Sequence, residues 1–104
     1  MNYKKFLFQT IILLFLFFSY DAYSQTAEEY FDRGYDKVKN GDYYGAISDF
    51  NKAIELKPDY GEAYFGRSVG KALLENKSEA CQDARKAQEL GFDAASEVIK
   101  MVCN

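Results

Sequence analysis

The chain carries an internal repeat: when its sequence of 104 residues is shifted against itself by 34 positions, two segments match without a gap. A period of this length is typical of proteins built from stacked helical hairpins, in which each repeat is one hairpin. Both segments are therefore predicted to form the same pair of helices. The identical pairs are Glu28/Glu62, Tyr30/Tyr64, Phe31/Phe65, Arg33/Arg67, Lys37/Lys71, Ala46/Ala80, Asp49/Asp83, Lys52/Lys86, Ala53/Ala87, Glu55/Glu89 and Leu56/Leu90.

The segment from Asp42 to Pro58 has the clearest helical pattern. Ala46, Phe50 and Ala53 fall on one face of a helix with 3.6 residues per turn. Asp42 is placed to cap the N-terminus of this helix, and Pro58 prevents its continuation because proline lacks an N–H group. The two alanines allow a second helix to approach closely, so the neighbouring segments are predicted to be helical as well.

Capping and turn residues predict where the other helices begin and end. Thr26 with Glu29 three positions later is typical of a capping box, and Asn40-Gly41 is typical of a turn. Gly91 suits the left-handed conformation that ends many helices. Further helices are expected over residues 27–39, 61–74, 78–90 and 93–101, the last two capped by Ser78 and Asp93.

The first copy of the repeat resembles the tetratricopeptide repeat through Tyr30, Gly34, Ala46, Phe50, Ala53 and Pro58, and the second copy through Tyr64, Ala80 and Ala87. The second copy departs from the family pattern at Ser68, where a glycine is usual, and at Ala84, where an aromatic is usual. The resemblance implies an all-α fold of two antiparallel hairpins, over residues 27–60 and 61–94. A C-terminal helix over residues 93–103 is expected to cap this stack, with Ala94, Ala95, Val98, Ile99 and Val102 facing inward and Glu97 and Lys100 facing water.

Residues 1–24 have the pattern of a cleaved secretory signal peptide. Lys4 and Lys5 precede an apolar run over residues 6–18, and the small residues Ala22 and Ser24 follow it. As a helix that run is only about 20 Å long, against a hydrocarbon core of roughly 30 Å. The domain over residues 25–104 is therefore expected to be exported by a bacterium, to the periplasm or outside the cell, without membrane insertion. An uncleaved membrane anchor is the alternative.

Cys81 and Cys103 are the two cysteines of the chain. In an exported protein an even number of cysteines favours a disulfide, which here would fasten the last helix to the one before it. Two free thiols are the alternative. A redox pair or a zinc site is disfavoured, because there is no Cys-x-x-Cys spacing and no histidine.

The composition disfavours catalysis and nucleic-acid binding. The absence of histidine removes the commonest general base and zinc ligand, and a net charge of −3 without a basic cluster is unlike a nucleic-acid surface. We therefore expect no enzyme, no metal and no cofactor. The carboxylates Glu28, Glu29, Asp32, Asp36, Asp49 and Glu55 have spacings typical of solvated helix faces, and Asp49/Lys52 and Asp83/Lys86 are spaced as i,i+3 pairs.

In the tetratricopeptide family the first helix of each hairpin lines a concave groove for a peptide or a partner's helix. By matching positions, the resemblance implies a groove of Phe31, Tyr35, Val38 and Lys39 from the first hairpin and Phe65, Val69, Ala72 and Leu73 from the second. The family's clamp for a peptide carboxylate uses lysine and asparagine where Phe31, Tyr35, Phe65 and Val69 stand here, so an apolar partner is favoured over an acidic C-terminus. In the alternative, Phe31, Tyr35 and Phe65 are core residues like Tyr30, Tyr64 and Phe50.

These observations together predict an exported, non-enzymatic module that binds a protein or peptide partner through the groove. Two repeats are fewer than the three that such stacks usually need. The alternative function is therefore structural: a homodimer in which the groove is used for the protein's own assembly. The repeated arginines, Arg33 and Arg67, are expected to form ion pairs within the stack.

Overall fold

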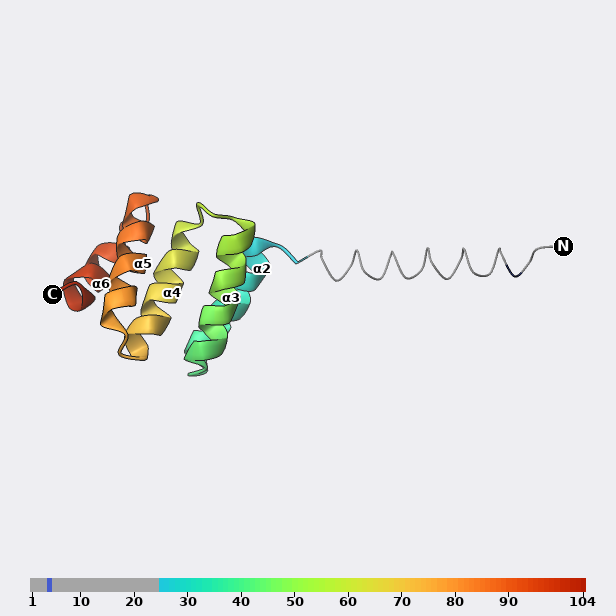
Figure 1. The fold of residues 1–104 in the computed structure, drawn as a ribbon, viewed down its shortest axis with the longest axis horizontal. Helices are drawn as coiled ribbons and strands as arrows, with labels where there is room; N and C mark the ends of the chain where they lie inside the picture. Colours follow the sequence, from blue (N-terminus) through green and yellow to red (C-terminus); the bar gives the residue numbers. More distant parts are fainter. Residues whose placement is uncertain (1–3, 5–24) are drawn as a thin grey trace.

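The computed structural model describes Lys4 and residues 25–104 (Figure 1). The predicted all-helical fold is confirmed, and residues 25–104 contain no strand. Most of the predicted signal segment, residues 1–24, lies outside the described residues. None of the helices described is long and apolar enough to cross a membrane. The helices are α2 (Ala27–Lys39), α3 (Tyr43–Leu56), α4 (Gly61–Leu73), α5 (Lys77–Glu89) and α6 (Ala95–Val102).

The helices stack side by side in chain order (Figure 1). Helix α2 packs on α3 and α4 packs on α5, which gives the two predicted hairpins, and α3 packs on α4 to join them. Helix α6 packs mainly on α5 and also contacts α4. The first helices of the two hairpins, α2 and α4, are therefore neighbours on one side of the stack, where they also contact each other.

Close packing in the first hairpin depends on Phe50, which is 1% exposed. Glycines of two helices face its ring: a Cβ on Gly34 of α2 would lie 2.8 Å from Phe50 Cε1, and one on Gly66 of α4 would lie 2.6 Å from Phe50 Cζ. Real Cβ contacts are not this short, so both positions need glycine. The repeat pattern predicts Gly34, whereas the requirement for Gly66 comes from the joint between the hairpins.

The second hairpin solves the same packing problem with different residues. Ser68 and Ala84 stand 34 positions after Gly34 and Phe50, and both are 0% exposed. A larger residue thus replaces the glycine where a smaller residue replaces the phenylalanine, so the two departures from the repeat pattern compensate in volume. The Ser68 hydroxyl is left buried without a hydrogen-bond partner among the residues described.

Each hairpin is also held by one buried carboxylate. Asp83 is 5% exposed and accepts two hydrogen bonds from Arg67, at 2.8 and 2.7 Å, while Lys71 Nζ lies 2.9 Å from its Oδ2. Asp49, also 5% exposed, pairs with Lys37 at 2.8 Å and Arg33 at 3.6 Å.

The predicted ion pairs of the two arginines are confirmed, whereas the prediction that Asp49 lies on a solvated face was wrong. The i,i+3 pairing of Asp49 with Lys52 was wrong too, because the cations of the preceding helix reach the buried carboxylate; Lys52 pairs with Glu55 at 3.1 Å. The predicted i,i+3 pair of Asp83 with Lys86 was also wrong, because Lys86 pairs with Glu89 at 3.4 Å.

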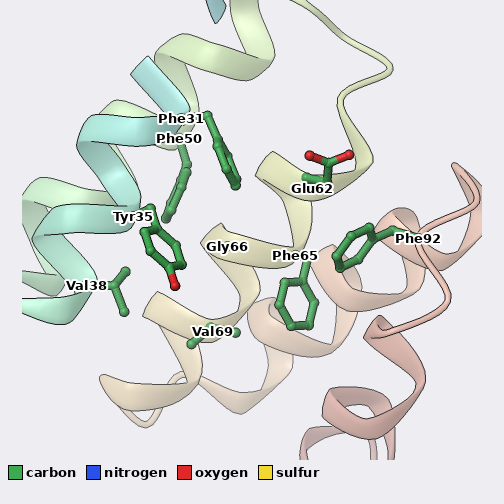
Figure 2. A pocket seen from close by; sticks show the side chains of 9 residues that line it. All are labelled: Phe31, Tyr35, Val38, Phe50, Glu62, Phe65, Gly66, Val69 and Phe92. Atoms are coloured by element: carbon green, nitrogen blue, oxygen red, sulfur yellow. The ribbon is translucent and has the colours of Figure 1, made fainter. Parts of the chain in front are cut away.

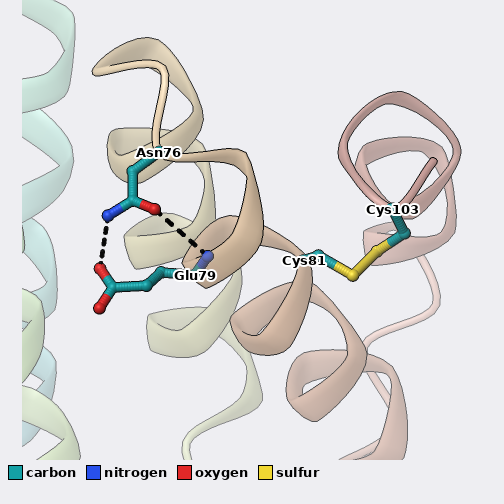
Figure 3. Close-up of a disulfide and its surroundings, with 4 residues drawn as sticks. All are labelled: Asn76, Glu79, Cys81 and Cys103. Carbon is teal, nitrogen blue, oxygen red and sulfur yellow. Dashed lines mark hydrogen bonds between the residues drawn. A yellow bond between two sulfur atoms is a disulfide. The ribbon is translucent and has the colours of Figure 1, made fainter.

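Two predicted caps also differ. Helix α5 is capped by Asn76, not Ser78: the Asn76 Oδ1 accepts the Glu79 N–H at 3.4 Å, and the Asn76 amide donates to Glu79 Oε2 at 2.6 Å (Figure 3). These two bonds explain this start, because Glu79 lies three residues after Asn76. They differ from a capping box in that Glu79 accepts from the side-chain amide of Asn76, whose backbone N–H donates to the Lys71 carbonyl. Helix α6 begins after Ala94 without a side-chain cap, so Asp93 does not cap it.

Helix α6 stands where the first helix of a third repeat would stand. It lies 68 positions after the start of α2 and packs on the preceding hairpin. Its inner face is formed by buried Ala95 and Val98 and by half-buried Ile99 and Val102, while Ala94 is exposed, contrary to expectation. Glu97 and Lys100 face water as predicted and pair at 3.1 Å.

The sulfur atoms of Cys81 on α5 and of Cys103, which directly follows α6, lie at disulfide distance, as the sequence predicts (Figure 3). The residues one repeat earlier are Ile47 and Val69. At that joint the two hairpins are in close apolar contact: Gly70, next to Val69, lies so near Ile47 that a Cβ added to it would be 3.2 Å from Ile47 Cγ1. The cysteine pair thus occupies the joint that apolar packing occupies between the two complete hairpins.

Candidate functional groove

An apolar hollow of about 260 Å³ opens between α2 and α4 (Figure 2). Phe31, Tyr35 and Val38 come from one side, at the i, i+4, i+7 spacing of a single helix face. Glu62, Phe65, Gly66 and Val69 come from the other side, again on one helix face. Phe50 lies behind them, and Phe92 closes the hollow beside Phe65. We call this set of nine residues the groove: Phe31, Tyr35, Val38, Phe50, Glu62, Phe65, Gly66, Val69 and Phe92.

Aromatic rings build most of the groove wall, and they differ in how deeply they are packed. The Phe31 ring lies 5.7 Å from the Phe50 ring and 5.3 Å from the Tyr60 ring, centroid to centroid, so Phe31 belongs partly to the core. Tyr35 is 55% exposed and stacks on Phe31 at 6.5 Å. Of the two alternatives for these aromatic residues, core or groove, Phe31 therefore fits both, whereas Tyr35 lies at the open side of the groove.

The structure brings five of the eight predicted groove residues into this hollow: Phe31, Tyr35, Val38, Phe65 and Val69. Ala72 and Leu73 line a second hollow beside it, which shares Val69 with the groove. Lys39 lines neither hollow, because its ammonium lies over the Tyr35 ring at 5.5 Å. The second hollow is completed by Lys77 and by the α6 residues Val98, Met101 and Val102.

Four groove residues were not predicted as such, namely Phe50, Glu62, Gly66 and Phe92. The signal for two of them was present, because Glu62, Gly66 and Val69 share one face at i, i+4, i+7. Phe92 stands 34 positions after Pro58, so the second copy has a phenylalanine where the repeat pattern has a proline. Only the packing of its ring against Phe65, at 4.9 Å between centroids, brings it to the groove.

The residues of the repeat pattern lie away from the open groove, apart from Phe50 at its base. The buried residues of the pattern are Gly34, Ala46, Ala53, Ala80 and Ala87, whereas Pro58, two positions after the end of α3, is exposed. Tyr30 and Tyr64 are half-buried, each with an arginine over its ring: Arg33 at 5.4 Å and Arg67 at 5.2 Å.

Two pKa values report the electrostatics of the stack. Burial raises the pKa of Tyr60 above its ordinary value, and the negative charges of Glu62, Glu28 and Asp32 raise it further. The hydrogen bonds from Arg67 to Asp83 raise the pKa of Arg67. Three carboxylates therefore lie around the Tyr60 hydroxyl, with the Lys57 ammonium over its ring at 4.6 Å, whereas Arg67 is committed to an internal ion pair.

The one Ser-x-x-Lys pair of the described residues is not accessible to a substrate. Ser68 and Lys71 have the Ser-x-x-Lys spacing of some acyl enzymes, but Ser68 is 0% exposed and Lys71 Nζ lies 2.9 Å from Asp83 Oδ2. No substrate can reach that hydroxyl in this packing. Over the part of the chain described, no three metal-ligating side chains come together.

Comparisons with known proteins agree with this fold. The family model described as "Tetratricopeptide repeat" matches residues 27–60, which coincide with the first predicted repeat. The chain is 41% identical over 76 residues to "Protein SGT1 homolog" of Oryza sativa subsp. japonica, a match that covers 73% of this chain and 20% of the relative. It is 36% identical over 67 residues to "Tetratricopeptide repeat protein 36 homolog" of Nematostella vectensis, covering 64% of this chain and 37% of the relative.

A third relative is similar in size to the matched region. An uncharacterized protein of Methanocaldococcus jannaschii is 37% identical over 60 residues, which covers 58% of this chain and 70% of that protein. By contrast, the chain spans well under half the length of the rice and sea-anemone relatives. The part of the chain shared with these relatives is thus the region of the repeats. In the structure this region is an all-helical stack of two hairpins, and both hairpins carry the repeat pattern. The chain belongs to the tetratricopeptide repeat family.

Proposed function

We propose that the protein is an exported, non-enzymatic interaction module that holds a segment of a partner protein in the groove. The observation that carries this proposal is the apolar hollow between α2 and α4, which stays open although the packed helices around it are closely fitted. A protein–protein interaction module is what the family fold supports, and the comparisons are with proteins that contain the same repeat.

The exposed apolar side chains on this side support binding over a purely structural role. Tyr35 is 55% exposed, Leu73 50% and Met101 64%. They extend from the groove to the second hollow, which shares Val69 with it. A continuous apolar surface of this kind on a small protein usually marks an interface, and aromatic residues contribute strongly to such interfaces.

The chemistry of the groove favours an apolar segment over a free carboxylate. None of the nine groove residues is a lysine or arginine. A carboxylate entering the groove would lose water without gaining a cation, which costs free energy.

Self-association is the second candidate function. The stack has two complete hairpins and α6, and the same apolar surface would suit a second copy of the chain. In that case the groove would be covered in the dimer and would not be free for another protein.

We further propose that the protein acts in an oxidising, exported compartment. The sequence pattern of residues 1–24 supports export, and the pairing of Cys81 with Cys103 fits a compartment in which disulfides persist.

The function is tested by capture of partners with residues 25–104 as bait, using exported proteins of the source organism. The groove variant is Tyr35→Lys, which places a charge among apolar side chains. The matched control is Tyr44→Lys on α3, because Tyr44 is 77% exposed and lies outside the groove. We expect wild type and Tyr44→Lys to recover the same protein and Tyr35→Lys to lose it, with equal thermal unfolding of all three. Equal recovery by all three would reject the groove as the binding surface.

A further inference from the structure

Glu62 is the one charged residue of the groove. It lies in the first turn of α4, is exposed, and stands beside the Phe65 and Phe92 rings (Figure 2). Within the described residues it forms no ion pair or hydrogen bond through its carboxylate, in contrast to the carboxylates of Asp49 and Asp83. A carboxylate at the end of an apolar groove is therefore available to a bound molecule.

The repeat supplies an internal comparison for this carboxylate. Glu28 stands 34 positions before Glu62, in the first turn of α2. Its Oε1 lies 3.6 Å from Lys57 Nζ, which also lies over the Tyr60 ring at 4.6 Å from the centroid. In the first repeat, a cation is thus held between this carboxylate and an aromatic face.

The second repeat lacks that cation. The residues 34 positions after Lys57 and Tyr60 are Gly91 and Ala94. Gly91 has a φ of +93°, a conformation that lysine adopts only with strain. It lines a surface hollow together with Glu62 and with Lys57, whose ammonium is paired with Glu28. The place that Lys57 fills beside Glu28 is therefore left open beside Glu62, with the Phe92 ring next to it.

We propose that the groove binds an apolar segment that carries a lysine or arginine, and that Glu62 holds the cation of this side chain beside Phe92. The inference rests on the proposed function, and it adds the chemistry of the partner. The apolar part of the segment covers Phe31, Tyr35 and Val69, and the cation lies at the Glu62 end. A cation between a carboxylate and aromatic rings gains both ionic and cation–π attraction.

The charges around the groove support this choice of partner. Asp32, Glu28 and Glu62 lie near enough to Tyr60 that all three raise the pKa of its hydroxyl. Residues 25–104 carry eleven cationic and fifteen anionic side chains, a net charge of −4. Three carboxylates therefore face one cation, Lys57, around Tyr60. This local excess of negative charge and the overall net charge attract a cationic segment and repel an acidic one.

The experiment is selection from a phage-displayed library of random 12-residue peptides on residues 25–104. It uses wild type, Glu62→Lys, Glu62→Gln and the groove variant Tyr35→Lys. The matched control is Glu29→Lys, which alters another exposed first-turn glutamate, on α2 and outside the groove. Because a first-turn carboxylate also stabilises its helix, the thermal unfolding of every variant is recorded, and selection is carried out well below the lowest transition.

We expect wild type and Glu29→Lys to enrich peptides that combine aromatic or aliphatic residues with a lysine or arginine at a fixed separation. Glu62→Lys should instead enrich aspartate or glutamate at that position, and Glu62→Gln should weaken a selected basic peptide about tenfold. Peptides without a basic residue, or the same peptides on wild type and Glu62→Lys, would overturn the inference while leaving groove binding intact. No enrichment on wild type relative to Tyr35→Lys would overturn the proposed function itself, and this inference with it.

Discussion

At the scale of single residues, the joint between the hairpins is a contact of Phe50 with two glycines. Replacement of Gly66 by alanine adds a methyl group 2.6 Å from Phe50 Cζ. Alanine gains up to about 1 kcal/mol in helix propensity over glycine, but overpacking of a close-fitted core costs about 1–3 kcal/mol. Gly66→Ala is therefore predicted to destabilise the protein by about 1–2 kcal/mol, as measured by urea unfolding.

Gly70→Ala is the matched control for this prediction. Its Cβ would meet Ile47 Cγ1 at 3.2 Å, the end of a side chain that can move by a few tenths of an ångström. Here the gain in helix propensity should prevail or balance the contact. If both variants lost the same stability, the close fit of Phe50 against Gly66 would not be what joins the hairpins.

The buried hydroxyl of Ser68 gives a residue-scale prediction of opposite sign. Ser68 is 0% exposed and its Oγ has no partner among the residues described. Removal of an unpaired buried hydroxyl recovers about 1–3 kcal/mol of desolvation cost, so Ser68→Ala should stabilise the protein, measured as a rise in Tm. The control is Ser48→Ala, because Ser48 is an exposed residue of α3 and its replacement changes helix propensity without changing a buried group. An equal rise in Tm for both would mean that the Ser68 hydroxyl is paired in solution.

At the scale of elements, the turns of the two hairpins have the same shape but different residues. Gly41 follows α2 with φ of +82°, and Glu75, 34 positions later, follows α4 with φ of +64°. A left-handed conformation costs a residue with a Cβ roughly 1–2 kcal/mol, whereas glycine loses about 0.4–1 kcal/mol through its freer unfolded chain. Glu75→Gly is therefore predicted to stabilise the protein by roughly 0.5–1 kcal/mol in urea unfolding. Glu75→Ala, which removes the charge but keeps the strain, should not.

The Cys81–Cys103 pair is placed to fasten the last helix of the stack, α6, to α5. Cys81 and Cys103 are 22 positions apart, and closing a loop of this size stabilises a protein by about 3 kcal/mol, mainly through the unfolded chain. Reduction is predicted to lower the unfolding free energy by about this amount and to speed hydrogen exchange in α6 more than in α2. The double variant Cys81→Ala/Cys103→Ala should behave like the reduced protein and ignore reductant. Equal exchange of α6 before and after reduction would show that its packing on α5 is sufficient alone.

The helices and hairpins could be predicted because their causes are local. Periodicity, Asp42, Pro58 and Gly41 fix helix faces and ends within a few residues of chain, and the repeat doubles each signal. The cap of α5 was misplaced because Asn76 and Ser78 are both good caps, and only Asn76 has a glutamate three residues later.

The groove could be predicted only in part, because its other causes lie between elements. The groove face of α2 was implied by the family resemblance: Phe31, Tyr35 and Val38 do line the hollow, and Lys39 does not. Phe92 and the burial of Asp49 depend instead on how one hairpin meets the next, which no local pattern contains. The repeat also suggests equivalence where the two copies differ. Glu62 matches Glu28 in sequence, but the residue that corresponds to Lys57, the partner of Glu28, is Gly91 in the second copy.

At the scale of the whole molecule, binding to a partner requires that no second copy of the chain covers the apolar side of the stack. The groove and the second hollow form one surface along α2, α4 and α6, with Tyr35, Leu73 and Met101 exposed on it. If a second copy covered this surface, no partner segment could reach Tyr35. Binding to another protein therefore requires that the chain be monomeric at working concentration.

The most direct measurement is size-exclusion chromatography with light scattering on residues 25–104, over a range of concentrations, for wild type, Tyr35→Lys and Tyr44→Lys. An interaction module with an open groove predicts the mass of one chain for all three. A wild-type mass of two chains that persists on dilution and falls to one chain in Tyr35→Lys alone would contradict it, because the groove would then serve the protein's own assembly.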